Sequence, residues 1–478
     1  MQNTGKKIVI GMFWRFSEKI TAQFVSFVVS IVLARILLPE DYGIVAIVNV
    51  FMALAEVFIT SGLGTALVQK KDTNELDFST IFWCNLILSL LLYLIFFFIS
   101  PFIASFYKMP LLSPVLRVFG IRIPISAINS IQNAYVSRNM DFKKFFFATI
   151  IGTIISAFIG ILMAKKGFGV WSLVIQNLSN AIIDTIVLSF IIKWYPKFIF
   201  SIKSAKPLIS FGWKILATDI IGTAFNQLNS FIIGKKYTAS DLAFYSKGRQ
   251  FPDLINGNVS GTLIAVLFPA MSLSDDKNQI KEIRRKSLKM LEYVTFPLMF
   301  GMIAIADNMI SVLLTEKWIE SVFYVRVTCC VAIIGILGTT LIQEIKAIGR
   351  SDITLKLEFI KKPIYIIIIV FVMPFGVKAI AISSILIELI AFIINIYPVA
   401  KYIGFDFKTH LLDALPSFIL SLIMAIIVYC IRYIILNNIL CLIVQVLIGV
   451  FIYILLSFIT KNENYIYLIN IFRNKILR

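Results

Sequence analysis

The chain has 478 residues, of which 59% are apolar and 15% are charged, and its mean hydropathy is +0.91. A soluble globular domain is typically about 45–50% apolar and about 25% charged, so this composition excludes that class and indicates a polytopic membrane protein. The net charge of +19 does not predict a nucleic-acid partner, because the cytoplasmic loops of membrane proteins collect Lys and Arg.

The first predicted span, residues 11–38, is about 28 residues long, and a bilayer needs only about 20. One helical face of this span carries polar or small residues at steps of three and four: Arg15, Lys19, Ala22, Ser26 and Ser30. Glu18 lies beside that face. Charged side chains at membrane depth normally face a bundle interior or a water-filled cavity, so this helix is expected to line a polar space.

The pattern of the first span returns about 200 residues later, as expected for an internal repeat. The letters MFW at 12–14 become FGW at 211–213, and Lys214 takes the place of Arg15. The second polar face consists of Lys214, Thr218, Gly222, Asn226 and Asn229. Each helix is followed by a short break that includes an acid, ARILLPEDYG at 34–43 and GKKYTASDLAFY at 234–245. Two matching halves with cationic first helices are typical of a transporter.

The predicted fold class is an all-α polytopic membrane protein with about 14 transmembrane helices. The first six spans are 11–38, 42–68, 78–106, 112–136, 142–164 and 168–193. The second six are 207–234, 241–272, 290–315, 320–345, 354–375 and 377–400, and two more follow at 411–435 and 437–460. This predicts two pseudo-symmetric six-helix bundles, 1–200 and 201–405, then two additional helices in 406–460 and a cytoplasmic tail at 461–478.

The distribution of Lys and Arg predicts the orientation of these spans. With the N-terminus in the cytoplasm, roughly 28 of these residues fall inside, about 9 outside and about 8 within spans. Both termini are therefore predicted to be cytoplasmic. The longest basic run, KNQIKEIRRKSLK at 277–289, is interpreted as an amphipathic cytoplasmic connector, with binding of a partner or of anionic lipid head groups as the alternative.

Polar residues recur at steps of three or four on later spans, which places them on single helical faces. The second span carries Asn49, Glu56, Thr60 and Gly64, and the fourth carries Arg122, Ser126, Asn129 and Asn133. The sixth carries Asn177, Asn180 and Asp184, and the eighth carries Arg249, Asp253, Asn256 and Ser260. Such stripes can serve only as hydrogen-bonding contacts between helices, and that alternative stays open.

Cations outnumber acids within the first eight spans, which predicts a cationic cavity and an anionic passenger such as a phosphate. The predicted substrate-binding cations are Arg15, Lys19, Arg117, Arg122, Lys214, Lys247 and Arg249. A buried carboxylate can bind Na⁺ or a proton, and the predicted coupling residues are Glu56, Asp219 and Asp253. The five cysteines and the single histidine show no metal-ligand spacing, so neither a metal site nor a cofactor is expected.

Four stretches carry a family resemblance: LARILLPEDYG at 33–43, GLGTALVQKKD at 62–72, YSKGRQFPDLI at 245–255 and FPLMFGMIAIADNMISVLLTEKW at 296–318. Over residues 8–400 the chain resembles the Wzx-type polysaccharide flippases of the multidrug/oligosaccharidyl-lipid/polysaccharide exporter (MOP) superfamily, which includes teichuronic and colanic acid exporters and has a MATE-like fold. The resemblance implies two bundles around a cationic lumen that works by alternating access. The implied passenger is an undecaprenyl-pyrophosphate-linked oligosaccharide, moved from the inner to the outer leaflet of the bacterial cytoplasmic (inner) membrane. Membrane lipids and polysaccharide-assembly proteins are the further partners that it implies.

Three alternative functions are weighed against that expectation. A peptidoglycan-precursor (lipid II) flippase would also carry a pyrophosphate, whereas a cation-coupled drug exporter should have an acidic cavity. A membrane-bound polysaccharide polymerase or ligase would need catalytic residues and usually a sizeable outer loop. The predicted outer loops, such as AKKGFG at 164–169, are only a few residues long and show no acid–base constellation. The chain is therefore predicted not to be an enzyme.

Overall fold

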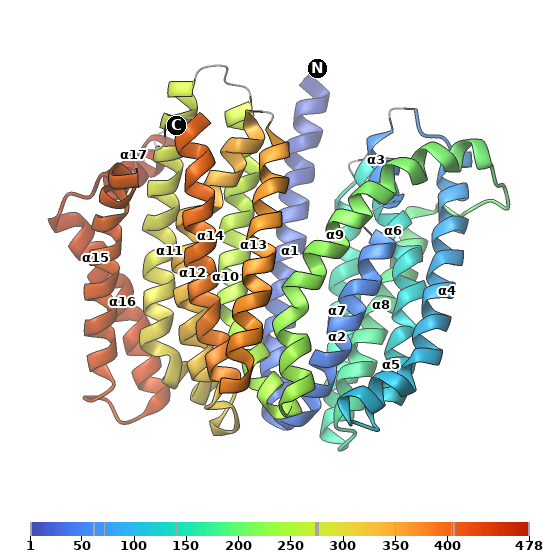
Figure 1. Ribbon diagram of the computed structural model, residues 1–478, viewed down its shortest axis with the longest axis horizontal. Helices are drawn as coiled ribbons and strands as arrows, with labels where there is room; N and C mark the ends of the chain where they lie inside the picture. Colours follow the sequence, from blue (N-terminus) through green and yellow to red (C-terminus); the bar gives the residue numbers. More distant parts are fainter. Residues whose placement is uncertain are drawn as a thin grey trace. The chain divides into compact units, whose positions relative to one another are not determined.

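The structure is a computed structural model that describes residues 2–60, 63–70, 72–139, 141–272, 277–348, 350–402, 404 and 407–476. Some side chains inside these ranges lie outside the description, among them those of 262–270 and of Lys214. In the described ranges every element of regular secondary structure is a helix (Figure 1). The predicted all-α fold is confirmed.

The chain divides into two compact units, Met1–Ala243 and Phe244–Arg478. The first unit contains α1 (Gln2–Ile36), α2 (Pro39–Thr60), α3 (Leu63–Gln69), α4 (Glu75–Tyr107), α5 (Leu112–Gly120), α6 (Arg122–Asn139), α7 (Lys143–Lys165), α8 (Val170–Ile192) and α9 (Ile202–Lys236). The next helix, α10 (Ala239–Ser272), begins in the first unit and continues into the second. The second unit then contains α11 (Lys277–Leu313), α12 (Ser321–Ala347), α13 (Ser351–Val372), α14 (Val377–Tyr402), α15 (Phe407–Ile431), α16 (Asn438–Ile459) and α17 (Glu463–Ile476).

The border between these units differs from the division at residue 200 that the internal repeat predicts. In the structure α9 packs on α2, α3 and α4, so it belongs with the first unit by its contacts. The division at residue 200 was predicted from the repeat in the sequence, and the packing of the helices does not test that repeat. The division therefore stays a prediction.

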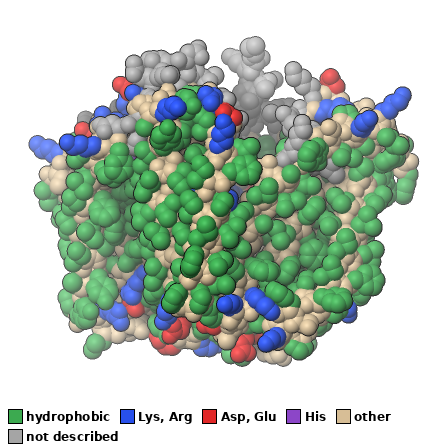
Figure 2. Space-filling model, viewed as in Figure 1, with side chains coloured by type: hydrophobic (Ala, Val, Ile, Leu, Met, Phe, Trp, Pro, Cys, Tyr) green, Lys and Arg blue, Asp and Glu red, His purple; other side chains and the backbone are tan. Residues whose placement is uncertain are grey.

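Eleven helices among the described residues are long and apolar enough to cross a membrane. A twelfth is added if Ile202–Ser210 and Ile215–Lys236, bent by 46°, form one span. The fourteen predicted spans also include α10 and α13, which are long enough at 34 and 22 residues but carry several charged side chains. The predicted count of fourteen is therefore not confirmed. Apolar side chains cover the flanks, and charged ones gather mostly toward the helix ends (Figure 2), as in a multi-span membrane protein.

In the first unit, α7 packs against both α1 and α8, and α6 contacts α2, α4 and α8. Glycine permits the close approach of α7 to α8, because a Cβ atom on Gly152 would lie 3.2 Å from the backbone nitrogen of Asp184. The apolar core at the α4 side of this unit includes the buried side chains of Phe78, Ile131 and Trp194. These contacts hold α6 and α8 side by side, and the polar stripes of both helices lie between them.

The two breaks recognised in the sequence start α2 and α10 in the same way. The backbone N–H of Leu38 donates to the Asp41 carboxylate at 3.2 Å, and that of Thr238 donates to Asp241 at 3.1 Å. In both places the acid at the third helical position accepts a hydrogen bond from the backbone N–H of the residue before the helix. This is one of the two hydrogen bonds that make up a capping box. A Cβ atom on Gly43 would lie 1.9 Å from the carbonyl oxygen of Ala239. The two helix starts therefore touch, and glycine is required at the contact.

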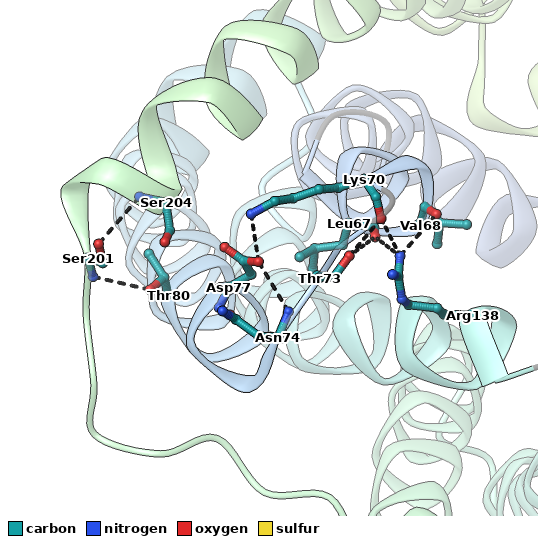
Figure 3. A network of polar contacts seen from close by, with 10 residues as sticks. All are labelled: Leu67, Val68, Lys70, Thr73, Asn74, Asp77, Thr80, Arg138, Ser201 and Ser204. Atoms are coloured by element: carbon teal, nitrogen blue, oxygen red, sulfur yellow. Dashed lines mark hydrogen bonds and ion pairs between the residues drawn. The ribbon is translucent and has the colours of Figure 1, made fainter.

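A polar network holds the turn between α3 and α4 (Figure 3). Lys70 Nζ lies 2.7 Å from Asp77 Oδ2, and Asn74 and Asp77 close a capping box at the start of α4. Arg138 on α6 donates to the carbonyl oxygen of Leu67 at 3.2 Å, near the C-terminal end of α3, where helix carbonyls lack intrahelical partners. The GLGTALVQKKD stretch thus serves to fix α3 between α4 and α6.

In the second unit α12, α15 and α16 all pack on α11. Asn308 Nδ2 donates to Gln445 Oε1 at 2.9 Å, and the Tyr453 hydroxyl donates to the carbonyl oxygen of Tyr293 at 2.8 Å. Both contacts join α11 to α16 through buried groups. The two additional C-terminal helices are therefore part of the second unit and packed on its longest helix.

The basic run at 277–289 forms the start of α11, and three of its cations pair with acids on other helices of the second unit. Arg284 lies 3.3 Å from the buried carboxylate of Glu344, and Arg285 pairs with Asp413 on α15. Lys289 lies 2.9 Å from Glu463 at the start of α17 and also contacts Asp413. These pairs support the interpretation of the run as a structural connector, and its cytoplasmic location stays a prediction.

Candidate functional site

Arg122 stands at a break in the fourth predicted span. The predicted fourth span is confirmed as one candidate membrane span, Leu112–Asn139, in which α5 ends at Gly120 and α6 begins at Arg122. The Arg122 side chain is 30% exposed, and one guanidinium nitrogen lies 2.8 Å from Glu56 Oε1 on α2. This ion pair joins α2 to α6 within the first unit.

A polar cavity of about 160 Å³ lies between α6 and α8, with Arg122 at its wall. Its lining consists of Arg122, Ile125, Ser126 and Asn129 from α6 and of Asn177, Asn180, Ala181, Asp184 and Thr185 from α8. Asn129 Nδ2 donates to Asp184 Oδ2 at 3.0 Å, which links the two walls. The polar stripes predicted on the fourth and sixth spans therefore face each other across one cavity.

α1 carries two further predicted cations in the first unit. Arg15 lies 2.8 Å from Glu18, and its guanidinium stands 4.9 Å from the ring centre of Phe145 on α7. The side chain of Arg15 is 55% exposed and Lys19 is also exposed, whereas Glu18 is buried. Glu18 is the charged neighbour of Asp184 on α8. The acidic side of α1 is therefore turned toward the wall of the cavity.

Arg117 lies only five positions before Arg122 but makes different contacts. Its Nε donates to Ser100 Oγ at 3.0 Å and to the carbonyl oxygen of Phe97 at 3.3 Å. The guanidinium carbon also stands 4.5 Å from the Phe97 ring centre. Both partners are on α4, so Arg117 ties α5 to α4 and is not brought together with Arg122.

Lys247 and Arg249 lie on α10 in the second unit. Arg249 donates to the Tyr245 hydroxyl at 3.1 Å and pairs with Asp253 at 3.2 Å. Lys247 is 5% exposed, and its ammonium group donates to Gln250 Oε1 at 3.1 Å. Each of these cations thus has a polar partner within one helical turn.

The remaining predicted residues, Lys214 and Asp219, lie on α9. The Lys214 side chain lies outside the described residues, and Asp219 is half-buried. Of the three predicted coupling acids, Asp253 pairs with a cation on its own helix, whereas Glu56 pairs with Arg122 from another helix. Spacing in the sequence reveals a pair within one helix, but it does not reveal a pair between two helices.

Asp184 is absent from the predicted site residues, although it belongs to a predicted polar stripe. Asp184 belongs to the site because it accepts a hydrogen bond from Asn129 across the cavity and because Glu18 lies near it. The signal in the sequence is the spacing of three and four that joins Asn177, Asn180 and Asp184. That spacing identifies a face, but not which other helix the face meets.

Comparison with known sequences finds proteins that are named for the biosynthesis or transport of polysaccharides. A family model described as polysaccharide biosynthesis protein matches residues 32–323. The succinoglycan biosynthesis transport protein ExoT of Rhizobium meliloti is 26% identical over 66% of this chain and 64% of its own length. The teichuronic acid biosynthesis protein TuaB of Bacillus subtilis is 24% identical over 74% of each chain. The lipopolysaccharide biosynthesis protein WzxC of Escherichia coli is 21% identical over 87% of this chain and 86% of its own.

Two solved structures resemble the fold. The lipid II flippase MurJ in an inward closed conformation has a TM-score of 0.76 at 17% identity, covering 98% of this chain and all of its own. An inward-facing multidrug resistance MATE family transporter of the MOP superfamily has a TM-score of 0.61 at 15% identity, covering 80% of this chain and 94% of its own. The fold is thus shared with MurJ and MATE proteins. Because the family model matches more than half of the sequence, the chain belongs to the polysaccharide biosynthesis protein family.

Proposed function

We propose that this protein is a flippase that moves an undecaprenyl-pyrophosphate-linked oligosaccharide from the inner to the outer leaflet of the bacterial cytoplasmic membrane. Family membership, relatives named for succinoglycan transport and for teichuronic acid and lipopolysaccharide biosynthesis, and the flippase fold support this proposal. The observation that carries it is the partly exposed guanidinium of Arg122 at the wall of a polar cavity within a membrane-spanning helix bundle.

The pyrophosphate is the part of such a passenger that Arg122 would bind. A guanidinium presents a planar fork of donors that matches two phosphate oxygens at once, which an ammonium group does not. In the structure one branch of that fork is engaged by Glu56. Binding of pyrophosphate to Arg122 would therefore replace a carboxylate by a more highly charged anion. The remaining predicted cations, Arg15, Lys19, Arg117, Lys214, Lys247 and Arg249, are proposed as further positive charge along the path.

The exchange of partners at Arg122 suggests how transport would couple to an ion. When pyrophosphate takes Arg122, Glu56 loses its cation at membrane depth, where an unpaired charge is costly. Glu56 would then take up a proton or Na⁺. Asp219 and Asp253 are proposed as alternative coupling residues, although Asp253 has its own cation in Arg249.

Both termini are proposed to be cytoplasmic, and polysaccharide-assembly proteins are proposed to receive the flipped product at the outer face.

A peptidoglycan precursor would offer the same pyrophosphate to Arg122. The likeness to MurJ, at 17% identity, is a likeness of fold and does not favour that passenger. The relatives named for polysaccharide biosynthesis favour the oligosaccharide.

The experiment that tests this function removes the Arg122 guanidinium. Arg122→Ala should abolish surface glycan while the protein inserts at normal levels, and Arg122→Lys should restore part of it because charge is kept and the fork is lost. The readout is surface glycan measured with glycan-specific antibody, normalised to membrane protein. Arg350→Ala is the matched control, since Arg350 pairs with its near neighbour Asp352 and is placed in no proposed site. Normal glycan export by Arg122→Ala would remove this residue from the binding site.

A further inference from the structure

Two arginines share one carboxylate near the C-terminal end of α11 in the second unit. Arg326 on α12 donates from Nη2 to Asp307 Oδ2, and Arg432, which follows the last residue of α15, places Nη1 3.0 Å from the same oxygen. Arg326 Nε also donates to the carbonyl oxygen of Ile303 at 3.4 Å. Three helices thus meet at one charged centre, at the end of the second unit opposite to the C-terminus (Figure 1).

The charge at this centre does not balance. Two guanidinium groups face a single carboxylate, and like charges this close repel each other unless anions compensate them. The nearby pair of Lys378 with Glu320, 3.4 Å apart, is neutral and leaves the surplus unchanged. The described helix ends and links around the centre carry four bases against three acids: Lys317, Arg326, Lys378 and Arg432 against Asp307, Glu316 and Glu320. One further anion would balance them.

Both guanidinium groups keep donors for such an anion. The side chains of Arg326 and Arg432 are 35% and 42% exposed. In the described part of the chain, Nη1 of Arg326 and both Nε and Nη2 of Arg432 have no hydrogen-bond partner. Two guanidinium groups that reach one carboxylate oxygen can also reach two oxygens of one phosphate, which is the anion that such donor forks match best.

The link between α15 and α16 indicates where this centre lies in the membrane. After Arg432 the link continues with Tyr433, Ile434 and Leu436, whose side chains are all exposed, the last at 95%. A link surrounded by water is normally polar, whereas Tyr and apolar side chains suit the level at which lipid head groups meet acyl chains. The two arginines therefore lie at the level of the head groups.

We propose that Arg326 and Arg432 bind the phosphate group of an anionic phospholipid, whose acyl chains lie on the apolar surface of α15 and α16. A phosphate diester supplies the single negative charge that the centre lacks. Exposed apolar residues on the adjoining ends of α15 and α16, among them Ile426 and Ile439, favour a lipid over a free phosphate. On the proposed orientation the lipid belongs to the outer leaflet. The site lies in the second unit alone and does not depend on which passenger is carried.

The test is the thermal stability of the full-length protein in detergent, with phosphatidylglycerol added at increasing concentration. A lipid that binds only the folded state raises the melting temperature in a saturable way. Phosphatidylglycerol should stabilise the wild type, whereas phosphatidylcholine and inorganic phosphate should not. Arg432→Gln, which removes one charge at the end of a helix, should raise the half-saturating concentration of phosphatidylglycerol at least about tenfold. Lys378→Gln, in an exposed pair at the same end, is the matched control and should keep the wild-type response.

Asp307→Asn separates a lipid site from a cluster of charges that serves the structure alone. The amide leaves both arginines without their carboxylate, so phosphate should bind them more readily and the half-saturating concentration of phosphatidylglycerol should fall. A purely structural cluster predicts a lower melting temperature without lipid and no change in the response to lipid. This variant also decides the test if Arg432→Gln does not fold.

The proposal is overturned if phosphatidylcholine or inorganic phosphate stabilises the wild type as well as phosphatidylglycerol does. It is also overturned if Arg432→Gln keeps the wild-type half-saturating concentration, or if Asp307→Asn fails to lower it. Stabilisation by undecaprenyl pyrophosphate that Arg432→Gln removes, without an effect of phosphatidylglycerol, would assign the centre to the passenger instead. None of these measurements follows glycan transport, so failure here is distinguishable from failure of the flippase proposal.

Discussion

At the scale of single residues, the Arg122–Glu56 pair is partly exposed, so a substitution at either residue should change transport without preventing folding. Both side chains are about 30% exposed, at 30% and 31%. Breaking a fully buried ion pair costs about 3–5 kcal/mol, whereas an exposed pair contributes about 0.2–1 kcal/mol. Because the pair is only partly buried by the protein, its contribution should lie below the range for fully buried pairs. Variants at either residue are therefore expected to fold, so that a loss of export reports on the site.

Glu56→Gln tests whether this acid couples transport to an ion. The amide keeps a hydrogen bond to Arg122 but cannot exchange a proton or hold Na⁺, so transport should lose its dependence on the coupling ion. The measurement is the rate of export as external pH and Na⁺ are varied, with Asp219→Asn assayed in parallel. If both variants keep the wild-type dependence on pH and Na⁺, neither residue is the coupling site.

At the scale of helices, the contact between the starts of α2 and α10 explains two stretches of the sequence, ARILLPEDYG at 34–43 and GKKYTASDLAFY at 234–245. The two together belong to the internal repeat, and the first also carries the family resemblance. Asp41 and Asp241 each accept a backbone N–H at the start of a helix, so both acids serve the structure. Gly43 lies at the contact itself, since its Cβ would meet the Ala239 carbonyl at 1.9 Å. Backbone atoms cannot move aside as a flexible side chain can, so a methyl group here must separate the two helix starts.

Gly43→Ala is therefore expected to destabilise the first unit by about 1–3 kcal/mol, the usual range for overpacking. Gly222→Ala on α9 is the matched control, because its Cβ would meet nothing within 4 Å and alanine favours the helix. The measurement is the melting temperature of both purified variants beside the wild type. Equal melting temperatures for Gly43→Ala and wild type would show that the contact between α2 and α10 is not tight.

The sequence predicted helices and their ends better than it predicted contacts between helices. Apolar length identifies spans because one local signal suffices, and spacing on one helix identifies the Arg249–Asp253 pair. The Arg122–Glu56 pair and the meeting of Asp184 with Asn129 depend on how neighbouring helices are rotated. Local spacing carries no information on that rotation. The fourth span, predicted over 112–136, corresponds to one candidate membrane span, Leu112–Asn139, in which only Ile121 separates α5 from α6.

At the scale of the whole molecule, the distribution of charge is the basis for orientation. The basic run at 277–289 and the short break at 234–245 should lie on opposite sides of the membrane, because strongly basic loops stay in the cytoplasm. Single cysteines placed at Asn278 and Ala239 in a cysteine-free background should react differently with an impermeant thiol reagent. Ala239→Cys should label from outside intact cells and Asn278→Cys only after the membrane is opened. Equal labelling from outside would reject the proposed topology.

The central claim, that the protein flips a pyrophosphate-linked oligosaccharide held by Arg122, is tested most directly in liposomes. Purified protein would be reconstituted with a fluorescent undecaprenyl-pyrophosphate-linked oligosaccharide, and a membrane-impermeant quencher would report the fraction in the outer leaflet over time. The wild type should move inner-leaflet lipid to the quencher, whereas Arg122→Ala and a monophosphate-linked oligosaccharide should both stay near the rate of protein-free liposomes. Wild-type rates for Arg122→Ala, or no acceleration by the wild type, would contradict the account.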